Sequence, residues 1–197
     1  MVRYLLLIYL VTYFLVAFVL PTYRVWKRTG VNPVTFAGSD NAHDLIGKLF
    51  KVVMAALAAV VLINTFFPDW NVYLLPAFWL ESEVVRYAGI ALLLISLVWT
   101  IAAQLQMGDS WRIGIDEKKA TSLVRSGIFG YSRNPIFLGM MVSLFGFLLA
   151  LPNAFTLLFL VLGWALIQIQ VRLEEEWLEK LHGDEYTDYK NNVRRWV

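Results

Sequence analysis

The sequence predicts an all-α integral membrane protein with about five transmembrane helices. Of its 197 residues, 59% are apolar or aromatic and only 16% are charged, which is too apolar for a soluble domain of this size. The apolar residues occur in long runs, each close to the roughly 20 residues that cross ~30 Å of hydrocarbon. Clusters of lysine and arginine separate some of these runs and not others, and this asymmetry predicts which ends face the cytoplasm.

Five apolar runs are the candidate membrane helices, at residues 4–20, 49–67, 84–105, 136–151 and 154–171. The first run has no small-residue cleavage site and is followed by Pro-Thr-Tyr, so we expect a retained helix rather than a signal peptide. Only Pro152 and Asn153 separate the last two runs, and this turn signal predicts a tight helical hairpin.

Basic residues are concentrated in the connections at 20–48 and 106–134 and in the tail after residue 171. The connection at 68–83 has three acidic residues and no lysine or arginine. Because basic loops stay in the cytoplasm, we expect the amino terminus outside and the long connections and tail inside. The compact form suggests a prokaryotic inner membrane.

The polar chemistry falls in the second half of the chain. Residues 1–105 hold three predicted helices and a cytoplasmic loop at 21–48, whereas residues 106–197 hold the hairpin and two polar segments. The hairpin leaves and re-enters the cytoplasmic side, so it brings these segments together at one cytoplasmic mouth. We therefore predict that residues 106–197 form the binding and catalytic region, with its site facing the cytoplasm.

A short amphipathic helix is predicted after Gly183, which is expected to cap the preceding helix. One face would carry Tyr186, Tyr189, Val193 and Trp196, with the basic residues away from it. Two interpretations are open: an anchor that lies on the membrane surface, or a lid over the cytoplasmic mouth.

Composition excludes several kinds of site. The chain has no cysteine, so disulfides, cysteine–zinc sites and thiol nucleophiles are unavailable. The only histidines are His43 and His182, so we expect neither a histidine metal site nor a histidine-based catalytic dyad. We expect no metal ion and no nucleic-acid partner, and the oligomeric state is open.

The stretch Tyr131–Gly139, "YSRNPIFLG", passes from polar residues into an apolar run, with Asn134 and Pro135 at the junction. Proline is tolerated in the first turn of a helix, where its missing N–H has no helical partner anyway. One interpretation is simply a helix start at the lipid headgroups. The other is that the exposed N–H groups of this helix end bind an anion.

Three adjacent glutamates near the end of the last apolar helix differ in their helical positions. Glu176 precedes Lys180 by four residues, the favourable order for a helical ion pair. Glu175 follows Arg172 by three residues on the same face, so it could serve that arginine or a ligand.

Glu174 shares its face with the apolar residues Val171, Leu178 and Leu181, so we expect its carboxylate to be partly buried and to need a partner. That partner could be an arginine of the facing segment, Arg133 or Arg125. It could also be the ammonium group of a ligand.

Four short motifs occur in order in the second half of the chain: Leu-Val-x-x-Gly-x-aromatic at 123–129, Arg-Asn-Pro-x-aromatic-x-Gly at 133–139, the pair Glu174–Glu175, and Gly-x-x-Tyr-x-x-Tyr at 183–189. From residue 109 onward the sequence resembles the isoprenylcysteine carboxyl methyltransferase family. This family belongs to a wider group of membrane enzymes that includes phosphatidylethanolamine methyltransferases.

The resemblance implies an integral membrane enzyme that binds S-adenosylmethionine at the cytoplasmic helix ends and takes a lipophilic or lipidated acceptor from the bilayer. The acceptor that the resemblance implies is an isoprenylcysteine-like carboxylate. By position, the implied cofactor-binding residues are Thr121, Ser122, Leu123, Val124, Phe129, Arg133, Asn134, Pro135, Phe137, Glu174 and Glu175. Among these, Glu174 would hold the amino group.

Arg172 is the candidate catalytic residue, because a guanidinium can orient a carboxylate acceptor. The family's arginine stands four residues before the first glutamate of the pair, whereas Arg172 stands two before Glu174. The chain also departs from the family at Asn134, where histidine is frequent, and at Phe129 and Phe137, where the motifs have tyrosine.

Methyl transfer from a sulfonium is an in-line displacement that needs alignment and exclusion of water more than acid–base catalysis. Aromatic faces attract the sulfonium cation, and Phe129, Tyr131 and Phe137 are available. Because the two reacting charges cancel in the transition state, a low-dielectric mouth favours the reaction.

Two other functions remain open. Sterol-type membrane reductases resemble this architecture but use a nicotinamide cofactor, and the glycine-rich phosphate signals expected for one are absent. A non-enzymatic membrane scaffold would keep the motifs without turnover. If the protein is a methyltransferase, the acceptor could be a carboxylate, an amine, a thiol or a small isoprenoid.

Overall fold

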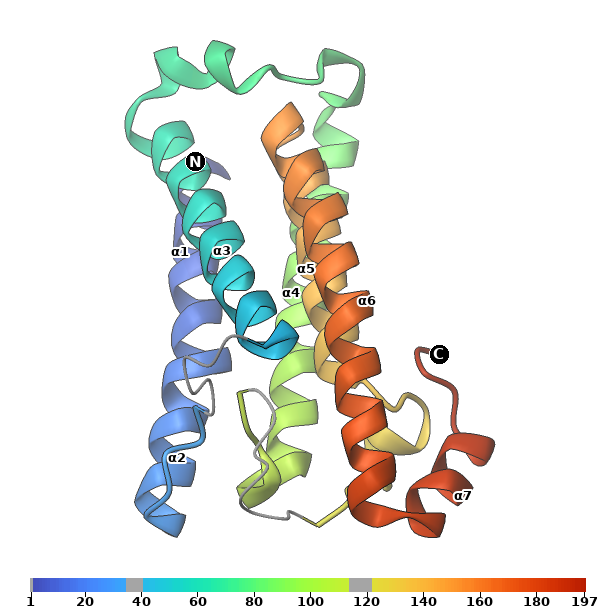
Figure 1. Ribbon diagram of the computed structural model, residues 1–197. Helices are drawn as coiled ribbons and strands as arrows, with labels where there is room; N and C mark the ends of the chain where they lie inside the picture. Colours follow the sequence, from blue (N-terminus) through green and yellow to red (C-terminus); the bar gives the residue numbers. More distant parts are fainter. Residues whose placement is uncertain (1, 35–40, 114–121) are drawn as a thin grey trace.

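The computed structural model describes residues 2–34, 41–113 and 122–197, and the elements that it defines there are helices (Figure 1). The α-helices are α1 (Val2–Phe14), α2 (Leu20–Thr29), α3 (Ala42–Phe66), α4 (Glu83–Met107), α5 (Pro135–Ala150), α6 (Ala154–His182) and α7 (Asp184–Asn192). A π-helical turn, η1 (Leu15–Val19), joins α1 to α2. Short 3-10 turns are η2 (Pro68–Leu74), η3 (Phe78–Leu80), η4 (Gly108–Ser110) and η5 (Gly127–Gly130).

The predicted all-α membrane architecture is confirmed. Within the described residues, four continuous helical stretches are long and apolar enough to cross a membrane: Val2–Thr29, Ala42–Phe66, Glu83–Ser110 and Ala154–His182. The fifth, α5, is apolar but has only 16 residues. At 1.5 Å per residue it spans about 24 Å, slightly less than the hydrocarbon core.

The first helix is longer than predicted, because it continues through Pro21 to Thr29 instead of ending near residue 20. Proline cannot donate to the carbonyl four residues earlier, which here is Ala17 O. That carbonyl accepts instead from Gln104 Nε2 of α4, at 2.7 Å. The helix ends at Gly30, whose φ of 69° suits a glycine cap.

The predicted helical hairpin is confirmed, with α5 and α6 joined by the turn at 151–153. Asn153 caps α6, accepting from the N–H groups of Phe155 and Thr156 at 3.0 Å each. Thr156 Oγ1 accepts in return from the Asn153 N–H at 3.2 Å, which completes a capping box. These contacts are local, which explains why the sequence located this turn.

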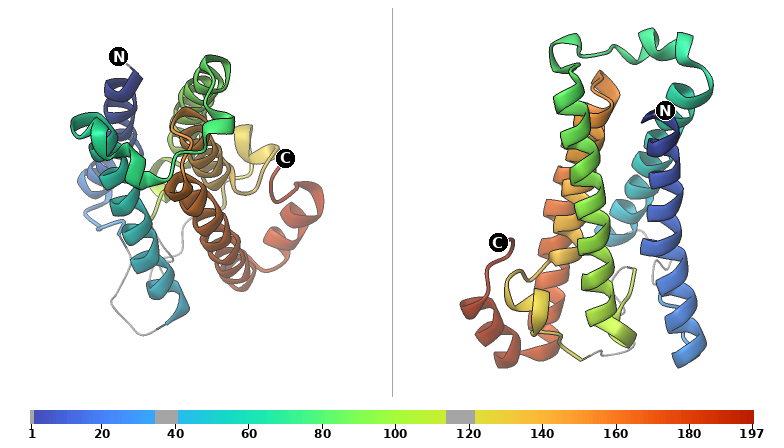
Figure 2. Two further views of the ribbon diagram at one scale, coloured as in Figure 1. Left: turned by 90° about the horizontal axis from the view of Figure 1, so that it is seen from above. Right: turned by 180° about the vertical axis from the view of Figure 1, so that it is seen from behind.

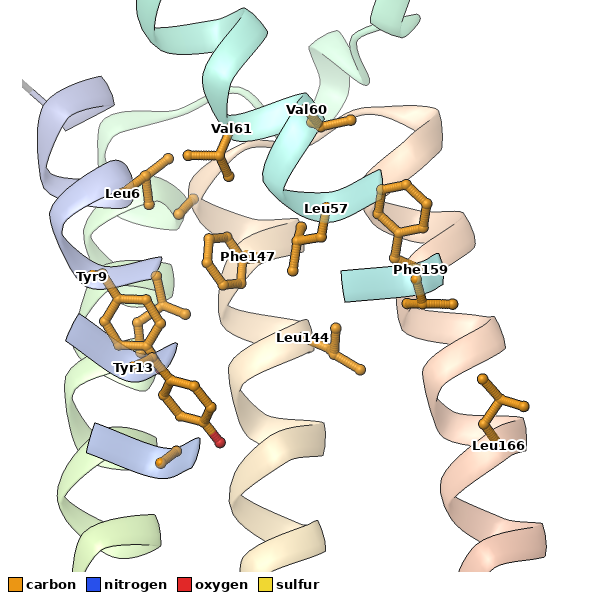
Figure 3. Packing of buried hydrophobic residues seen from close by; sticks show 14 of the residues in the cluster. Leu6, Tyr9, Tyr13, Leu57, Val60, Val61, Leu144, Phe147, Phe159 and Leu166 are labelled. Atoms are coloured by element: carbon orange, nitrogen blue, oxygen red, sulfur yellow. The ribbon is translucent and has the colours of Figure 1, made fainter. Parts of the chain in front are cut away.

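Helices α4 and α5 pack closely because glycines lie between them. A Cβ atom at Gly89 would lie 2.5 Å from the backbone nitrogen of Ala150 and 2.7 Å from the carbonyl oxygen of Gly146. Nearby, the hydroxyl of Tyr9 of α1 contacts Ser96 Oγ at 3.0 Å and Ser143 Oγ at 2.8 Å. The surrounding core unites α1, α3, α5 and α6 through residues such as Leu57 and Phe147 (Figure 3).

The bundle has two distinct ends. The connection at 68–80 crosses one end, and α2, η4, η5, α7 and the carboxyl terminus gather towards the other (Figures 1 and 2). The two polar segments predicted to meet at one mouth therefore lie at the same end. We call it the α7 end.

Candidate functional site

A cavity of about 790 Å³ extends from the α7 end into the bundle. Its polar part is lined by residues that include Ser122, Asn134, Gln170, Glu174, Tyr186 and Tyr189. Its apolar part lies between α1, η1, α3 and α5, with Leu10, Phe14, Phe18, Phe50, Met54 and Met140 among the lining residues. One space therefore connects a polar mouth with an apolar interior.

Most of the residues selected from the sequence line this cavity: Ser122, Leu123, Val124, Phe129, Arg133, Asn134, Pro135, Phe137 and Glu174. Thr121 lies outside the described residues. Arg172 and Glu175 are not among the lining residues. The structure thus brings segments around 122–137 and 174 to one site, and it places two candidates elsewhere.

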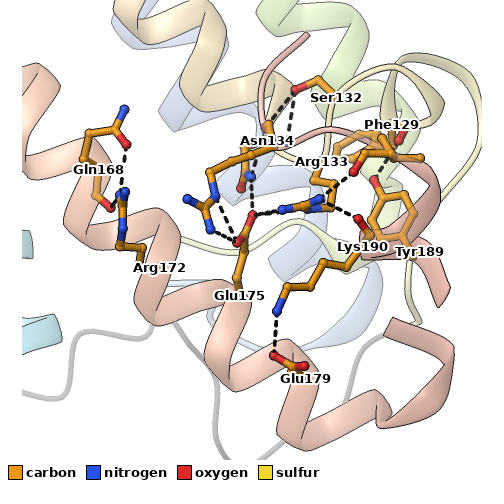
Figure 4. Close-up of polar contacts among 12 residues, drawn as sticks. Phe129, Ser132, Arg133, Asn134, Gln168, Arg172, Glu175, Glu179, Tyr189 and Lys190 are labelled. Carbon is orange, nitrogen blue, oxygen red and sulfur yellow. Dashed lines mark hydrogen bonds and ion pairs between the residues drawn. The ribbon is translucent and has the colours of Figure 1, made fainter. Parts of the chain in front are cut away.

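Glu175 is buried in an ion-pair cluster beside the cavity (Figure 4). Its Oε1 accepts from Arg133 Nη2 at 3.1 Å and from Asn134 Nδ2 at 3.1 Å. Its Oε2 accepts from Arg195 Nη2 at 2.7 Å. Burial alone would raise the pKa of this carboxyl, but Arg195 and Arg133 outweigh it and lower the pKa. Glu175 therefore has a structural role in this structure, and Arg133 pairs with it rather than with Glu174.

The carboxyl-terminal tail folds back onto the start of α5. The Arg133 N–H donates to Arg194 O at 3.0 Å, and Arg133 Nη1 donates to the carbonyl oxygens of Lys190, at 3.0 Å, and Val193. Asn134 Nδ2 donates to Arg195 O at 3.3 Å. Because Asn134 and Arg133 also line the cavity, the tail fixes the position of one cavity wall.

Helix α7 is amphipathic as predicted, and its aromatic face packs against the protein. Tyr186 and Tyr189 are buried, and the Tyr189 hydroxyl donates to Phe129 O at 2.7 Å. Both tyrosines line the cavity. The interpretation as a membrane-lying anchor on this aromatic face is therefore wrong, and α7 forms a wall of the mouth. Val193 and Trp196 lie beyond the end of α7.

Glu174 is half-buried and lines the cavity. It follows the apolar run of α6, which ends at Val171, so it lies outside the predicted hydrocarbon span. Its Oε1 accepts from Gln170 Nε2 at 2.7 Å, and no ion pair to it occurs among the described residues. Burial raises the pKa of Glu174 to about 7, although the hydrogen bond from Gln170 lowers it. The predicted contrast with exposed Glu176, which pairs with Lys180 at 2.7 Å, is confirmed.

Arg172 is exposed, and its Nη1 donates to Gln168 O at 2.6 Å and to Gln168 Oε1 at 2.9 Å (Figure 4). The position four residues before Glu174 holds Gln170, which is buried and lines the cavity. Gln170 was not among the site residues predicted from the sequence. Its position four residues before Glu174, which places the two side chains on one helix face, is the signal that could have identified it.

The start of α5 agrees with the sequence prediction, since Pro135 is its first residue. Asn134 does not cap this helix with its side chain, which instead contacts Glu175. Ile136 and Phe137, in the first turn, line the cavity. The first-turn N–H groups of a helix lack helical acceptors, so this helix start can hold an anionic group.

The described residues contain no cluster of three or more His, Cys, Asp or Glu side chains that could hold a metal ion. They do fit a zwitterionic amino-acid group, with a half-buried carboxylate for its ammonium and a helix start for its carboxylate. Two aromatic side chains, Phe129 and Phe137, also line the cavity.

A family model described as phospholipid methyltransferase matches residues 84–185, which is more than half of the chain. The chain belongs to the phospholipid methyltransferase family. The matched residues contain α4, the α5–α6 hairpin and the start of α7, and therefore most of the polar mouth.

Two named relatives extend this result. A protein-S-isoprenylcysteine O-methyltransferase of Saccharomyces cerevisiae is 26% identical over 151 residues, covering 75% of this chain and 62% of the yeast protein. The protein of the same name from Schizosaccharomyces pombe is 30% identical over 95 residues, covering 47% of this chain and 40% of that protein. The chain thus spans less than two thirds of the length of these relatives.

Proposed function

We propose that this protein is an integral membrane methyltransferase that uses S-adenosylmethionine and acts on a lipophilic acceptor with a carboxylate, of the isoprenylcysteine type. The observation that carries the proposal is the single cavity that joins a polar mouth to an apolar interior, in a chain of a methyltransferase family. A polar cofactor and a lipid-like acceptor can meet in such a space without entering water.

The cofactor, when bound, supplies the methyl group. Glu174 would bind its ammonium, and the first turn of α5 would bind its carboxylate. Phe129 and Phe137 would face its sulfonium. The backbone at Ser122–Val124 would contact the remainder of the cofactor, and Tyr186 and Tyr189 would exclude water on the α7 side.

The apolar part of the cavity would hold the hydrocarbon chain of the acceptor. Lys51 and Arg112 also line the cavity, so it contains positive charge that suits an acceptor carboxylate. Arg172 would have no catalytic role, because its guanidinium is bonded to Gln168 and it is not among the residues that line the cavity. The name of the two relatives supports a carboxylate acceptor.

We propose that the site faces the cytoplasm, because lysine and arginine are concentrated in segments that reach the α7 end. The compact form of the chain is the ground for proposing a prokaryotic inner membrane.

The test uses purified protein in detergent, S-adenosylmethionine labelled in its methyl group, and farnesylated N-acetylcysteine as acceptor. We expect label in a product that base hydrolyses to methanol, which identifies a methyl ester. Transfer to a base-stable product would contradict the carboxylate acceptor. Oxidation of NADPH with no methyl transfer would favour a reductase, and bound cofactor with no product from any lipid extract would favour a scaffold.

A further inference from the structure

Gln170 of α6 is a buried polar side chain with one unpartnered atom. It lines the cavity, and only 4% of its surface is exposed. Its Nε2 donates to Glu174 Oε1 at 2.7 Å. Its Oε1 is buried and has no hydrogen-bond partner among the described residues. A buried amide oxygen without a donor is unfavourable, so its position on a cavity wall indicates a ligand that carries one.

The orientation of the Gln170 amide follows from its neighbour. In the structure the NH₂ end of the amide donates to Glu174 and the amide oxygen is left over. This is the orientation that the ionised form of Glu174 requires, because an ionised carboxylate only accepts hydrogen bonds. Gln170 and Glu174 are four residues apart on α6, which places them on the same face, one turn from each other. Two acceptors are therefore adjacent on the cavity wall.

Among the described residues, neighbouring cations do not supply the missing donor. Arg133 and Arg195 bind Glu175, and Arg172 binds Gln168. Lys51 and Arg112 also line the cavity, but neither donates to Gln170 Oε1. Burial without a cation raises the pKa of Glu174, as expected for a carboxylate that lacks its countercharge. A primary ammonium group has three N–H donors and a positive charge, and it satisfies both acceptors at once.

We propose that Gln170 is a cofactor-binding residue that, together with Glu174, seats the α-ammonium group of the cofactor. The ammonium donates one hydrogen bond to Gln170 Oε1 and another to the Glu174 carboxylate, whose charge it balances. Gln170 also holds the carboxylate in place through its own NH₂ group. This inference rests on the proposed function, which supplies the cofactor.

The experiment compares two ligands that differ only at the amino group: S-adenosylhomocysteine and its analogue with hydrogen in place of the α-amino group. Equilibrium binding of both is measured for the purified wild type and for Gln170→Met, which keeps side-chain length but removes the amide. We expect the variant to bind S-adenosylhomocysteine roughly tenfold or more weakly, as for loss of a hydrogen bond to a charged group. Its affinity for the deaminated analogue should not change.

Gln168→Met is the matched control, because Gln168 bonds Arg172 on the exposed side of the same helix and should alter neither affinity. If thermal unfolding shows that Gln170→Met does not fold, Gln170→Asn keeps both amide groups one methylene shorter and should show the same selective loss.

An equal loss for both ligands, or no loss, would overturn the role of Gln170 while leaving the proposed function intact. Equal wild-type affinities for the two ligands would show that Gln170 and Glu174 do not bind the ammonium group, and they would leave the proposed function intact. A wild type that binds neither ligand would overturn the proposed function, and this inference with it.

Discussion

At the scale of single residues, the two adjacent glutamates of α6 differ because the helix turns by about 100° per residue. Glu174 follows Gln170 along the cavity wall, and Glu175 turns towards Arg133 and Arg195. The sequence predicted the burial of Glu174 from its apolar neighbours. It could not predict that Glu175 takes the arginines, because one of them arrives with the tail, 20 residues later.

Replacing Glu174 with Gln should weaken S-adenosylhomocysteine binding by roughly ten- to a hundredfold, since it removes a charged partner of a desolvated ammonium. Glu176→Gln is the matched control and should have no measurable effect, because Glu176 is exposed and forms a surface ion pair with Lys180. The measurement is a titration of the purified variants, with thermal unfolding as the folding check. Equal losses in both variants would mean that Glu174 has no special role.

The raised pKa of Glu174 predicts a pH dependence of binding. With a pKa of about 7 in the ligand-free protein, the carboxylate is mostly protonated at pH 6 and mostly ionised at pH 8. Only the ionised form balances an ammonium, so affinity for S-adenosylhomocysteine should rise roughly tenfold over this interval. Burial raises the pKa values of Tyr186 and Tyr189, which also line the cavity, so both stay protonated throughout.

The same shift has the opposite effect on the ligand-free protein. The pKa of Glu174 is higher in the folded than in the unfolded protein, so the folded state binds more protons between pH 4.5 and about 7. The contribution of Glu174 to the stability of the ligand-free protein therefore falls as pH rises through this range. Bound S-adenosylhomocysteine should offset this loss of stability. A binding curve that is flat with pH, or one that keeps its slope in Glu174→Gln, would exclude Glu174 as its source.

At the scale of secondary-structure elements, boundaries set by local contacts were predicted and those set by distant contacts were not. The α5–α6 turn depends on Asn153 and its immediate neighbours, and the sequence located it. The first helix continues past Pro21, and the carbonyl four residues before the proline, Ala17 O, accepts from Gln104, 87 residues after Ala17. A pattern read along the chain contains no sign of that contact.

The tail is an element without regular structure that is held by the start of α5. Arg195→Ala removes one of the two cations on Glu175 and should destabilise the protein by on the order of 1.5–3 kcal/mol, the value for a hydrogen bond to a charged group. Arg194→Ala is the control, since Arg194 is exposed and only its backbone contacts α5. Thermal unfolding in detergent measures both. If the two variants lose equal stability, the Glu175 cluster does not hold the tail.

At the scale of the whole molecule, the sequence predicted the polar part of the cavity but not its apolar part. Composition and run length predicted the membrane helices, and the hairpin predicted that the two polar segments meet at one end. The apolar part of the cavity comes from α1, η1 and α3, which carry no recognisable motif. It exists because of how these helices pack against α5, and that packing depends on contacts among four separate parts of the chain.

The orientation of the whole molecule is the last prediction. The connection at 68–80 and the α7 end lie at opposite ends of the bundle (Figure 1). Lysine and arginine are concentrated in the connections at 20–48 and 106–134 and in the tail, which reach the α7 end. Because basic segments stay in the cytoplasm, Asp69 should face outward and Asn191 inward. The chain has no cysteine, so Asp69→Cys and Asn191→Cys can each be labelled singly with a membrane-impermeant maleimide.

In intact cells the D69C variant should react and the N191C variant should react only after permeabilisation. Both positions are exposed on the protein, so failure to react reports the membrane barrier rather than burial. Labelling of both variants in intact cells would place the two ends of the bundle on one side, and it would contradict the odd number of crossings. Labelling of N191C alone would keep the crossings but reverse them, and the proposed site would then face away from the cytoplasm, where S-adenosylmethionine is supplied.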